Sequence, residues 1–257
     1  MSERLKAAFE SGRHLAATWV SAGSPVIAEV SASSAFDFVL IDTEHTTTTL
    51  ETVEHMHRAI VAAGGDAGTV IRVPWNDPVY LKRVLDVGVS GVMVPMIDTA
   101  AEAESLVDSL RYPPEGTRGI ASGRASGYGS DFRSYVERAS ETFVTIAQIE
   151  TLEGLENAEA IAAVDGVDAL FAGPADLSGA LGCFGEWDAE PFLEAMDRVI
   201  AAGEAADVPV GTLTVRPEDA PERVERGFGF QIVGKDTTAL REANERALEL
   251  YDEAADR

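Results

Sequence analysis

Residues 143–150 read FVTIAQIE, and residues 169–176 read ALFAGPAD. Each stretch opens with a short, continuously apolar run, which is typical of a strand that is buried on both faces. An acidic side chain lies at the end of each stretch, Glu150 in the first and Asp176 in the second. Two successive strands with carboxylates at the same end predict a parallel sheet with a site at its carboxyl edge.

Further runs of the same kind occur along the chain, separated by segments in which apolar residues have helical spacing. They cover residues 15–20, 38–41, 69–73, 91–95, 209–213 and 230–233. Eight strand–helix units in 257 residues predict the α/β class and a single (β/α)8 barrel domain spanning residues 1–257. An open, doubly wound sheet is the alternative architecture for this pattern.

The balance of charges is strongly acidic. The chain carries 44 acidic and 20 basic residues, and its formal net charge is −24. Such a surface repels nucleic-acid phosphates and anionic membranes, so we expect neither as a partner. Because the acidic residues are spread over the whole chain, they favour a halophilic protein from high-salt cytoplasm over an ordinary acidic protein.

Signals for export or membrane insertion are not expected in this chain. No apolar run approaches the roughly 18 to 20 residues that cross a bilayer. Residues 1–20 begin with mixed charges and hold no continuous apolar segment before a small-residue cleavage site. Cys183 is the only cysteine, which excludes an intrachain disulfide and a cysteine metal cluster. These features predict a cytoplasmic location.

Polar residues at the carboxyl ends of barrel strands are the candidates for function. Glu150 and Asp176 are hard oxygen donors, and with Gln148 beside them they predict a site for Mg²⁺ or Mn²⁺, with Co²⁺ as a further candidate. Two protein ligands leave coordination positions for water and a chelating substrate. The alternative for each carboxylate is a helix-capping role.

A base and a cation follow neighbouring strands. His45 comes directly after the predicted strand 38–41, where a neutral imidazole can act as a general base, and Asp86 can orient such a ring. The alternative is a surface histidine, which is what we expect of the other three histidines: His14, His55 and His57. Arg72 ends a buried strand, where a fixed guanidinium suits an enolate or carboxylate oxygen.

Residues 119–130 form the one glycine-rich stretch of the chain, GIASGRASGYGS. We interpret it as a βα loop, which serves either as a lid over the site or as a structureless connector. Arg124 within it can bind a distal carboxylate of a substrate, although an exposed loop arginine is the simpler interpretation.

Several motifs in order resemble the HpcH/HpaI aldolase family of class II pyruvate aldolases. They include DTEH at 42–45, RVPWNDP at 72–78, QIETLEG at 148–154 and GPADLSGALG at 173–182. The resemblance implies a barrel of the phosphoenolpyruvate/pyruvate-domain type. It also implies a last helix exchanged between subunits and a homohexamer built as a trimer of dimers.

The resemblance also implies a reaction, the reversible cleavage of a 4-hydroxy-2-oxo acid to pyruvate and an aldehyde without an organic cofactor. Glu150 and Asp176 would bind the metal, Arg72 would stabilise the enolate, and His45 would move protons with support from Asp86. Gln148 and the backbone around Gly173, Pro174 and Ala175 would position the small-molecule 2-oxo acid. Leu213 and Arg124 are further candidates for contact with the substrates, Arg124 with the aldehyde, independently of the resemblance. The run Thr46–Thr49 departs from the family pattern near the mouth and leaves the aldehyde partner open.

Three other functions remain compatible with the sequence. Lys235 ends the last predicted strand and could form a Schiff base in a class I aldolase. A related carbon–carbon lyase acting on a CoA thioester, of the citrate lyase or malyl-CoA lyase type, would need a basic surface for the CoA phosphates, and the sequence shows none. A non-catalytic barrel retained for binding or assembly predicts loss of some strand-end polar residues, whereas all of them are present.

Overall fold

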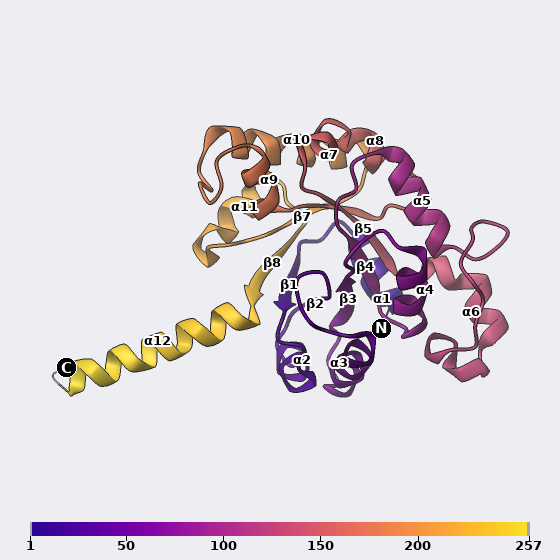
Figure 1. Ribbon diagram of the computed structural model, residues 1–257, viewed down its shortest axis with the longest axis horizontal. Coiled ribbons are helices and arrows are strands. Elements are labelled where there is room, and N and C mark those ends of the chain that lie inside the picture. The colour runs from indigo at the N-terminus through magenta and orange to yellow at the C-terminus, as the bar shows by residue number, and fades with distance from the viewer. Residues whose placement is uncertain (1, 256–257) are drawn as a thin grey trace.

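The computed structural model describes residues 2–255 and shows eight parallel strands closed into a barrel (Figure 1). Each strand pairs with its neighbour in sequence, and the last pairs with the first. The closed barrel is confirmed, and the open sheet is excluded. The strands are β1 (Leu15–Val20), β2 (Phe38–Asp42), β3 (Gly68–Arg72), β4 (Gly91–Val94), β5 (Val144–Ile149), β6 (Ala169–Ala172), β7 (Val210–Leu213) and β8 (Phe230–Lys235).

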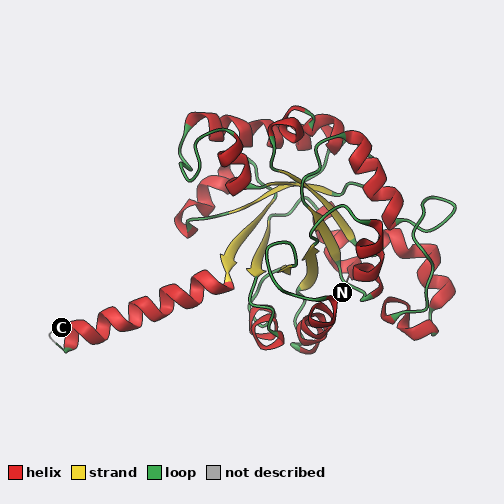
Figure 2. Cartoon of the chain, in the orientation of Figure 1, coloured by secondary structure: helices red, strands yellow, loops and turns green. Residues whose placement is uncertain are grey.

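Helices surround the strands and cover the outside of the barrel (Figure 2). Short 3₁₀ turns lie at Arg124–Gly129, Ala139–Glu141 and Pro217–Asp219. The α-helices are α1 (Ser2–Glu10), α2 (Pro25–Ala32), α3 (Leu50–Ala62), α4 (Pro78–Asp86), α5 (Ala100–Leu110), α6 (Phe132–Arg138), α7 (Leu152–Glu156), α8 (Ala158–Ala162), α9 (Pro174–Ala180), α10 (Glu190–Ala206), α11 (Ala220–Arg226) and α12 (Asp236–Ala254).

Capping residues begin several of these helices a few residues after a strand. Thr99 and Glu102 form a capping box at the start of α5. Asp77 accepts hydrogen bonds from two backbone N–H groups of α4, and Pro78 occupies its first turn. The loops after β3 and β4 are therefore short, so the carboxyl ends of these strands stay close to the helix starts.

Aromatic side chains fill the interior of the barrel and close its amino-terminal end. The ring of Phe9 on α1 lies with its centroid 5.1 Å from that of Phe230 and 6.0 Å from that of Phe38. All three rings are buried, and each burial contributes roughly 2 to 3 kcal/mol. Because α1 plugs the amino-terminal end, the interior can open to solvent only at the carboxyl ends of the strands.

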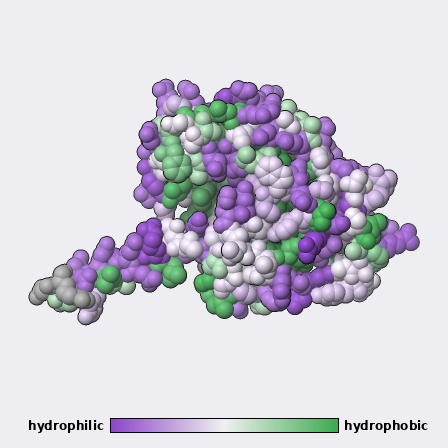
Figure 3. Space-filling model, viewed as in Figure 1, coloured by the Kyte–Doolittle hydropathy of each residue, from purple (hydrophilic) through white to green (hydrophobic). Residues whose placement is uncertain are grey.

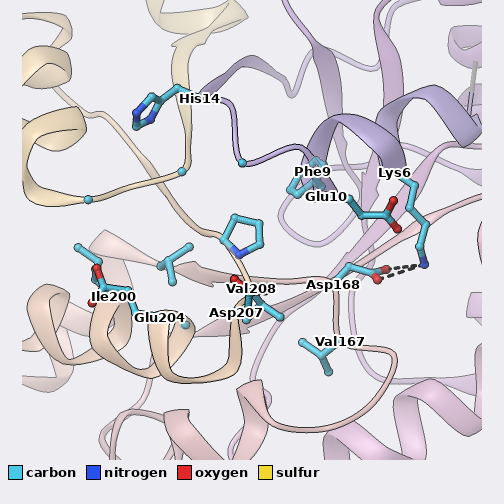
Figure 4. A pocket seen from close by; sticks show the side chains of 16 residues that line it. Lys6, Phe9, Glu10, His14, Val167, Asp168, Ile200, Glu204, Asp207 and Val208 are labelled. Carbon is cyan, nitrogen blue, oxygen red and sulfur yellow. Dashed lines mark hydrogen bonds and ion pairs between the residues drawn. The ribbon is translucent and has the colours of Figure 1, made fainter.

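A cavity of about 430 Å³ nevertheless lies outside this plug, between α1 and α10 (Figure 4). The Nζ of Lys6 lies 3.1 Å from a carboxylate oxygen of Asp168, and the pair bridges α1 to the start of β6. This cavity is at the amino-terminal side of the strands, whereas barrel enzymes carry their sites at the opposite end. We therefore assign it no catalytic role.

The glycine-rich stretch 119–130 is not a βα loop, so that interpretation was wrong. It follows α5, which has already returned the chain from the carboxyl end of β4 to the other side of the barrel. Its 3₁₀ turn, Arg124–Gly129, packs against α4. Arg118, just before the stretch, is buried and bound to Asp86, which fixes this segment to the end of α4.

The last helix, α12, leaves the barrel instead of packing on it (Figure 1). None of its residues is buried. Figure 3 shows this projection as mainly hydrophilic with a few apolar patches, and Leu240, Leu248 and Leu250 are exposed by 61%, 57% and 49%. A long helix without a partner in its own chain has a face available for another chain.

Within residues 2–255, no helix is long and apolar enough to span a membrane.

Candidate active site

A cavity of about 270 Å³ opens at the carboxyl ends of the strands. Most of the residues predicted for the site line it. Those residues are His45, Arg72, Gln148, Gly173, Pro174, Ala175, Asp176 and Leu213. Five other residues lie in the wall: Trp19, Ser21, Asp42, Phe171 and Lys235. Of these, only Lys235 was given a substrate role from the sequence, as the Schiff-base lysine of the alternative class I aldolase.

Arg72 is the central cation of the cavity, and three groups hold it. Its Nε and Nη2 donate to the two carboxylate oxygens of Asp42 at 3.0 and 2.8 Å, and its Nη1 lies 2.6 Å from Oε2 of Glu44. The guanidinium also lies over the Trp19 ring, 4.5 Å from its centroid. With its side chain only 7% exposed, Arg72 is both oriented and charge-balanced.

Asp42 binds Arg72, and this pairing could have been predicted from the order of the strands. It lies directly beside Arg72 in the register between β2 and β3. Burial alone would raise the pKa of Asp42, but the hydrogen bonds and charge of Arg72 outweigh this effect, and its pKa lies below the usual value. The carboxylate therefore stays ionised and keeps the guanidinium in place.

His45 lies at the rim of the cavity, where it can meet both solvent and a bound molecule. Its side chain is 70% exposed, and its Nε2 lies 3.7 Å from Oε2 of Glu44. Burial raises the pKa of Glu44 although the charges of Arg72 and His45 oppose that effect. The neighbouring carboxylate and the open position suit a group that exchanges protons with a ligand.

Glu150 is buried behind the cavity wall, between β4 and β5. Its Oε1 accepts a hydrogen bond of 2.9 Å from the backbone N–H of Met96, and its Oε2 accepts one from Nε2 of Gln148. Burial raises the pKa of Glu150 to about 7, and the charges of Asp176 and Glu44 add to this shift. A cation beside this carboxyl group would lower its pKa again and favour the ionised form.

Two backbone features hold Glu150 in position. Met96 has a φ of 54°, which places a non-glycine residue in the left-handed region, at a cost of roughly 1 to 2 kcal/mol. Its N–H is the donor to Glu150. At Gly173 an added Cβ would lie 3.0 Å from Oε2 of Glu150 and 3.1 Å from Nε2 of Gln148. A larger residue would crowd the carboxylate and the amide, so one of them would have to shift.

Helix capping does not account for the two acidic side chains. The N-cap of α7 is Thr151, whose hydroxyl accepts from Gly154 N–H, while Glu150 bonds across to the loop after β4. The N-cap of α9 is Gly173, without a side-chain cap, and Asp176 lies in the first turn and lines the cavity.

The residues at this end of the barrel fit a divalent cation. No cluster of three or more His, Cys, Asp and Glu side chains in metal-binding geometry occurs in residues 2–255. Glu150 and Asp176 interact electrostatically, and the buried Oε1 of Gln148 has no hydrogen-bond partner. Oxygen donors of this kind suit Mg²⁺ or Mn²⁺, with water and a ligand completing the coordination.

The structure does not bring Asp86 to His45 within one chain. Asp86 ends α4, which runs away from the carboxyl end of β3, so it lies near the opposite end of the barrel from His45. Its Oδ1 accepts a 2.9 Å hydrogen bond from Nη2 of the buried Arg118. Support for His45 from Asp86 of the same chain is therefore not observed.

Arg124 also lies away from the cavity. Its Nη1 donates to the backbone carbonyl of Val87 at 2.9 Å, and it packs where α4 ends. The expected contact between Arg124 and a substrate carboxylate is not made within one chain.

His57, expected on the surface, is buried and bonded to the Thr69 hydroxyl at 2.9 Å. Burial lowers the pKa of His57 to about 4, so it is a neutral core residue near pH 7.

Comparison with known proteins identifies relatives along the whole barrel. The chain is 40% identical over 231 residues to the 2-dehydro-3,6-dideoxy-6-sulfogluconate aldolase of Pseudomonas putida, covering 89% of each protein. It is 38% identical over 247 residues to the 4-hydroxy-2-oxo-heptane-1,7-dioate aldolase of Shigella sonnei, covering 95% of this chain and 93% of the relative. A crystal structure of an HpcH/HpaI aldolase/citrate lyase family protein from Burkholderia cenocepacia is 35% identical and matches with a TM-score of 0.93, covering 98% and 99% of the two chains.

A closed barrel with this site and named aldolases as relatives confirms the prediction of an enzyme of the aldolase class. The pattern that defines HpcH/HpaI aldolase/citrate lyase proteins matches residues 15–243. The chain therefore belongs to the HpcH/HpaI aldolase/citrate lyase family, as the motifs in its sequence indicated.

Proposed function

We propose that this chain is a divalent-metal-dependent aldolase that reversibly cleaves a 4-hydroxy-2-oxo acid to pyruvate and an aldehyde. The observation that carries the proposal is that Asp176, Gln148 and Arg72 line one cavity, while Glu150 lies behind its wall, bonded to Gln148 and interacting electrostatically with Asp176. Acidic oxygens suit a cation, and a fixed guanidinium suits a developing oxyanion.

Glu150 and Asp176 would hold Mg²⁺ or Mn²⁺, with Gln148 positioning the ligand through its free Oε1. When bound, such a cation supplies Lewis-acid polarisation of the 2-oxo group. Gly173, Pro174 and Ala175 form the adjoining wall, where their close approach shapes the place for a small 2-oxo acid. The residues of the cavity orient the 2-oxo acid and exclude water from it.

Arg72 stabilises the oxygen that gains negative charge as the carbon–carbon bond breaks. Because Asp42 and Glu44 already fix the guanidinium, no reorganisation is needed when the enolate forms. His45 accepts the proton of the 4-hydroxyl at Nε2 during cleavage and returns it during addition, with Glu44 beside it. Leu213 and Phe171 provide the apolar wall for the carbon chain.

The size of the cavity favours this reaction over one on a CoA thioester. Its volume of about 270 Å³ is below the roughly 300 to 1,000 Å³ of sites that hold drug-sized ligands. The relatives are named for a sulfogluconate and a heptane-dioate substrate, both of which carry a second acidic group. We therefore propose small, acidic 4-hydroxy-2-oxo compounds as the substrate class.

The decisive experiment is a cleavage panel with and without metal. We expect pyruvate release from 4-hydroxy-2-oxo diacids or 2-oxo-3-deoxy sugar acids to fall by at least about a hundredfold after chelation and to return with Mg²⁺ or Mn²⁺. Parallel assays in high and low KCl test the expected adaptation to high salt. Activity that survives thorough chelation would refute the metal role, and a pyruvate adduct on Lys235 after borohydride would favour the Schiff-base mechanism.

We also propose a homo-oligomer in which α12 packs on another subunit, as the resemblance to the family implies. In a single chain, α12 buries none of its residues, although Leu240 and Leu248 are exposed on it. Replacing both by glutamate should turn a hexamer into smaller species in sedimentation velocity, whereas the matched polar change Glu249→Gln should not. A wild-type chain that sediments as a 27.3 kDa monomer would exclude this assembly.

A further inference from the structure

The pairing of β8 with β1, which we call the seam of the barrel, holds Lys235 at the cavity. Lys235 is the last residue of β8 and pairs in register with Trp19 on β1. The next residue, Asp236, accepts hydrogen bonds from the backbone N–H groups of Ser21 at 3.0 and 3.1 Å and of Ala22 at 2.9 Å. These bonds tie the end of β8 to the loop after β1, so the position of Lys235 in the wall is fixed.

Lys235 is also a cation of the cavity whose charge is not already balanced. It lines the cavity, is exposed, and has no hydrogen-bond or ion-pair partner among the residues that the structure describes. Arg72, by contrast, is bound by both Asp42 and Glu44. In a chain with a net charge of −24, an unpaired ammonium group in a cavity wall points to an anionic ligand.

The position of Lys235 relative to the proposed metal ligands determines which part of a substrate it can bind. Glu150, Asp176 and Gln148 come from β5 and from the turn after β6, whereas Lys235 comes from β8 beside Leu213 and Ser21. A 2-oxo acid bound at the former would extend its carbon chain into the rest of the cavity that Lys235 also lines. We expect the far end of that chain to be the part that meets Lys235.

We propose that Lys235 sets the specificity of the enzyme by binding an acidic group, a carboxylate or sulfonate, at the far end of the aldehyde. This inference rests on the proposed aldolase function and adds the residue that recognises the acidic end of the second substrate. Arg124, which the sequence suggested for this task, is bound to the Val87 carbonyl elsewhere in the chain. An exposed ammonium–carboxylate contact is modest in energy, but it discriminates between an acidic and a neutral aldehyde of equal size.

The test compares two aldehydes of matched shape in pyruvate addition with Mg²⁺, succinic semialdehyde and the neutral 4-methylpentanal. We expect wild type to prefer the acidic aldehyde by about fivefold in kcat/KM, and Lys235→Met to remove most of that preference. Lys235→Arg should keep most of the preference. Lys82→Met, which removes another lysine on α4 away from the cavity, is the matched control and should not change it.

A ratio of two rates separates recognition from folding, because a poorly folded variant loses both activities together. A preference that stays within about twofold of wild type in both Lys235→Met and Lys235→Gln would overturn the inference, as would a wild type that treats the two aldehydes alike. Exchange of the pyruvate methyl protons in D₂O, measured without aldehyde, tests the aldolase function separately. Wild type that neither exchanges these protons nor forms product refutes that function instead.

Discussion

Replacing Glu150 by glutamine is expected to lower kcat/KM for cleavage by about a thousandfold or more. The substitution keeps the shape of the side chain and removes the negative charge that the cation requires. Because Asp42 and Glu44 are bound to Arg72, Glu150 and Asp176 are the two carboxylates that we propose as ligands, and the loss of one leaves little to hold the metal. Steady-state kinetics over a range of Mn²⁺ concentrations, with calorimetric measurement of metal binding, checks the result.

Glu153→Gln is the matched control for this substitution. Glu153 is an exposed glutamate on α7, only three positions along the chain, and takes no part in the cavity. It should retain wild-type kinetics and metal affinity. If Glu150→Gln kept both its metal affinity and its activity, the assignment of Glu150 as a ligand would be wrong.

The same Glu150→Gln variant should be more stable than wild type when no metal is present. Burial raises the pKa of Glu150 from 4.5 to about 7, so between these values the folded chain retains a proton that the unfolded chain has released. Wild-type stability therefore falls as the pH rises through this interval, by about 3 kcal/mol at most. Chemical denaturation in chelator should show the variant to be more stable at pH 8, with the difference shrinking towards pH 5.

Lysine in place of Arg72 is the second large effect that we expect, a fall in kcat/KM of about a hundredfold or more. A lysine keeps the charge but cannot donate to both oxygens of Asp42, contact Glu44 and lie over Trp19 at the same time. The loss should appear mainly in kcat because the guanidinium acts on charge that develops during the reaction.

Arg216→Lys provides a control with the same chemical change. Arg216 is bound to the carboxylates of Asp188 and Asp219 but lies at the surface, outside the cavity. Its variant should show unchanged kinetics. Equal kinetics for Arg72→Lys and wild type would show that the guanidinium of Arg72 has no special part in the reaction.

The strands and most of the cavity could be predicted because both depend on short-range patterns. Continuous apolar runs such as 143–149 mark strands buried on both faces, and the closed barrel brings all their carboxyl ends together. Residues directly after these runs, including His45 and Asp176, therefore had to meet. Asp42 could also have been found, because equal positions on neighbouring parallel strands place it beside Arg72.

Asp86 and Arg124 show where that reasoning fails. Both were assigned to the site from their residue types, but a helix that begins near the carboxyl end of one strand ends at the other side of the barrel. Asp86 is the last residue of such a helix, and Arg124 packs near it. Only the resemblance to the family suggested that α12 leaves its own barrel, because the apolar spacing of residues 236–254 is the same whether the helix packs on its own barrel or on another.

The seam between β1 and β8 has a consequence for the order in which the site forms during synthesis. Trp19 is among the first residues of the cavity to leave the ribosome, and Lys235 and the Asp236 anchor are among the last. Until the eighth strand has emerged, the barrel has an open edge and the cavity lacks a wall. A nascent chain with Glu150, Asp176 and Arg72 already folded is thus still without a complete site, which forms only once β8 has joined β1.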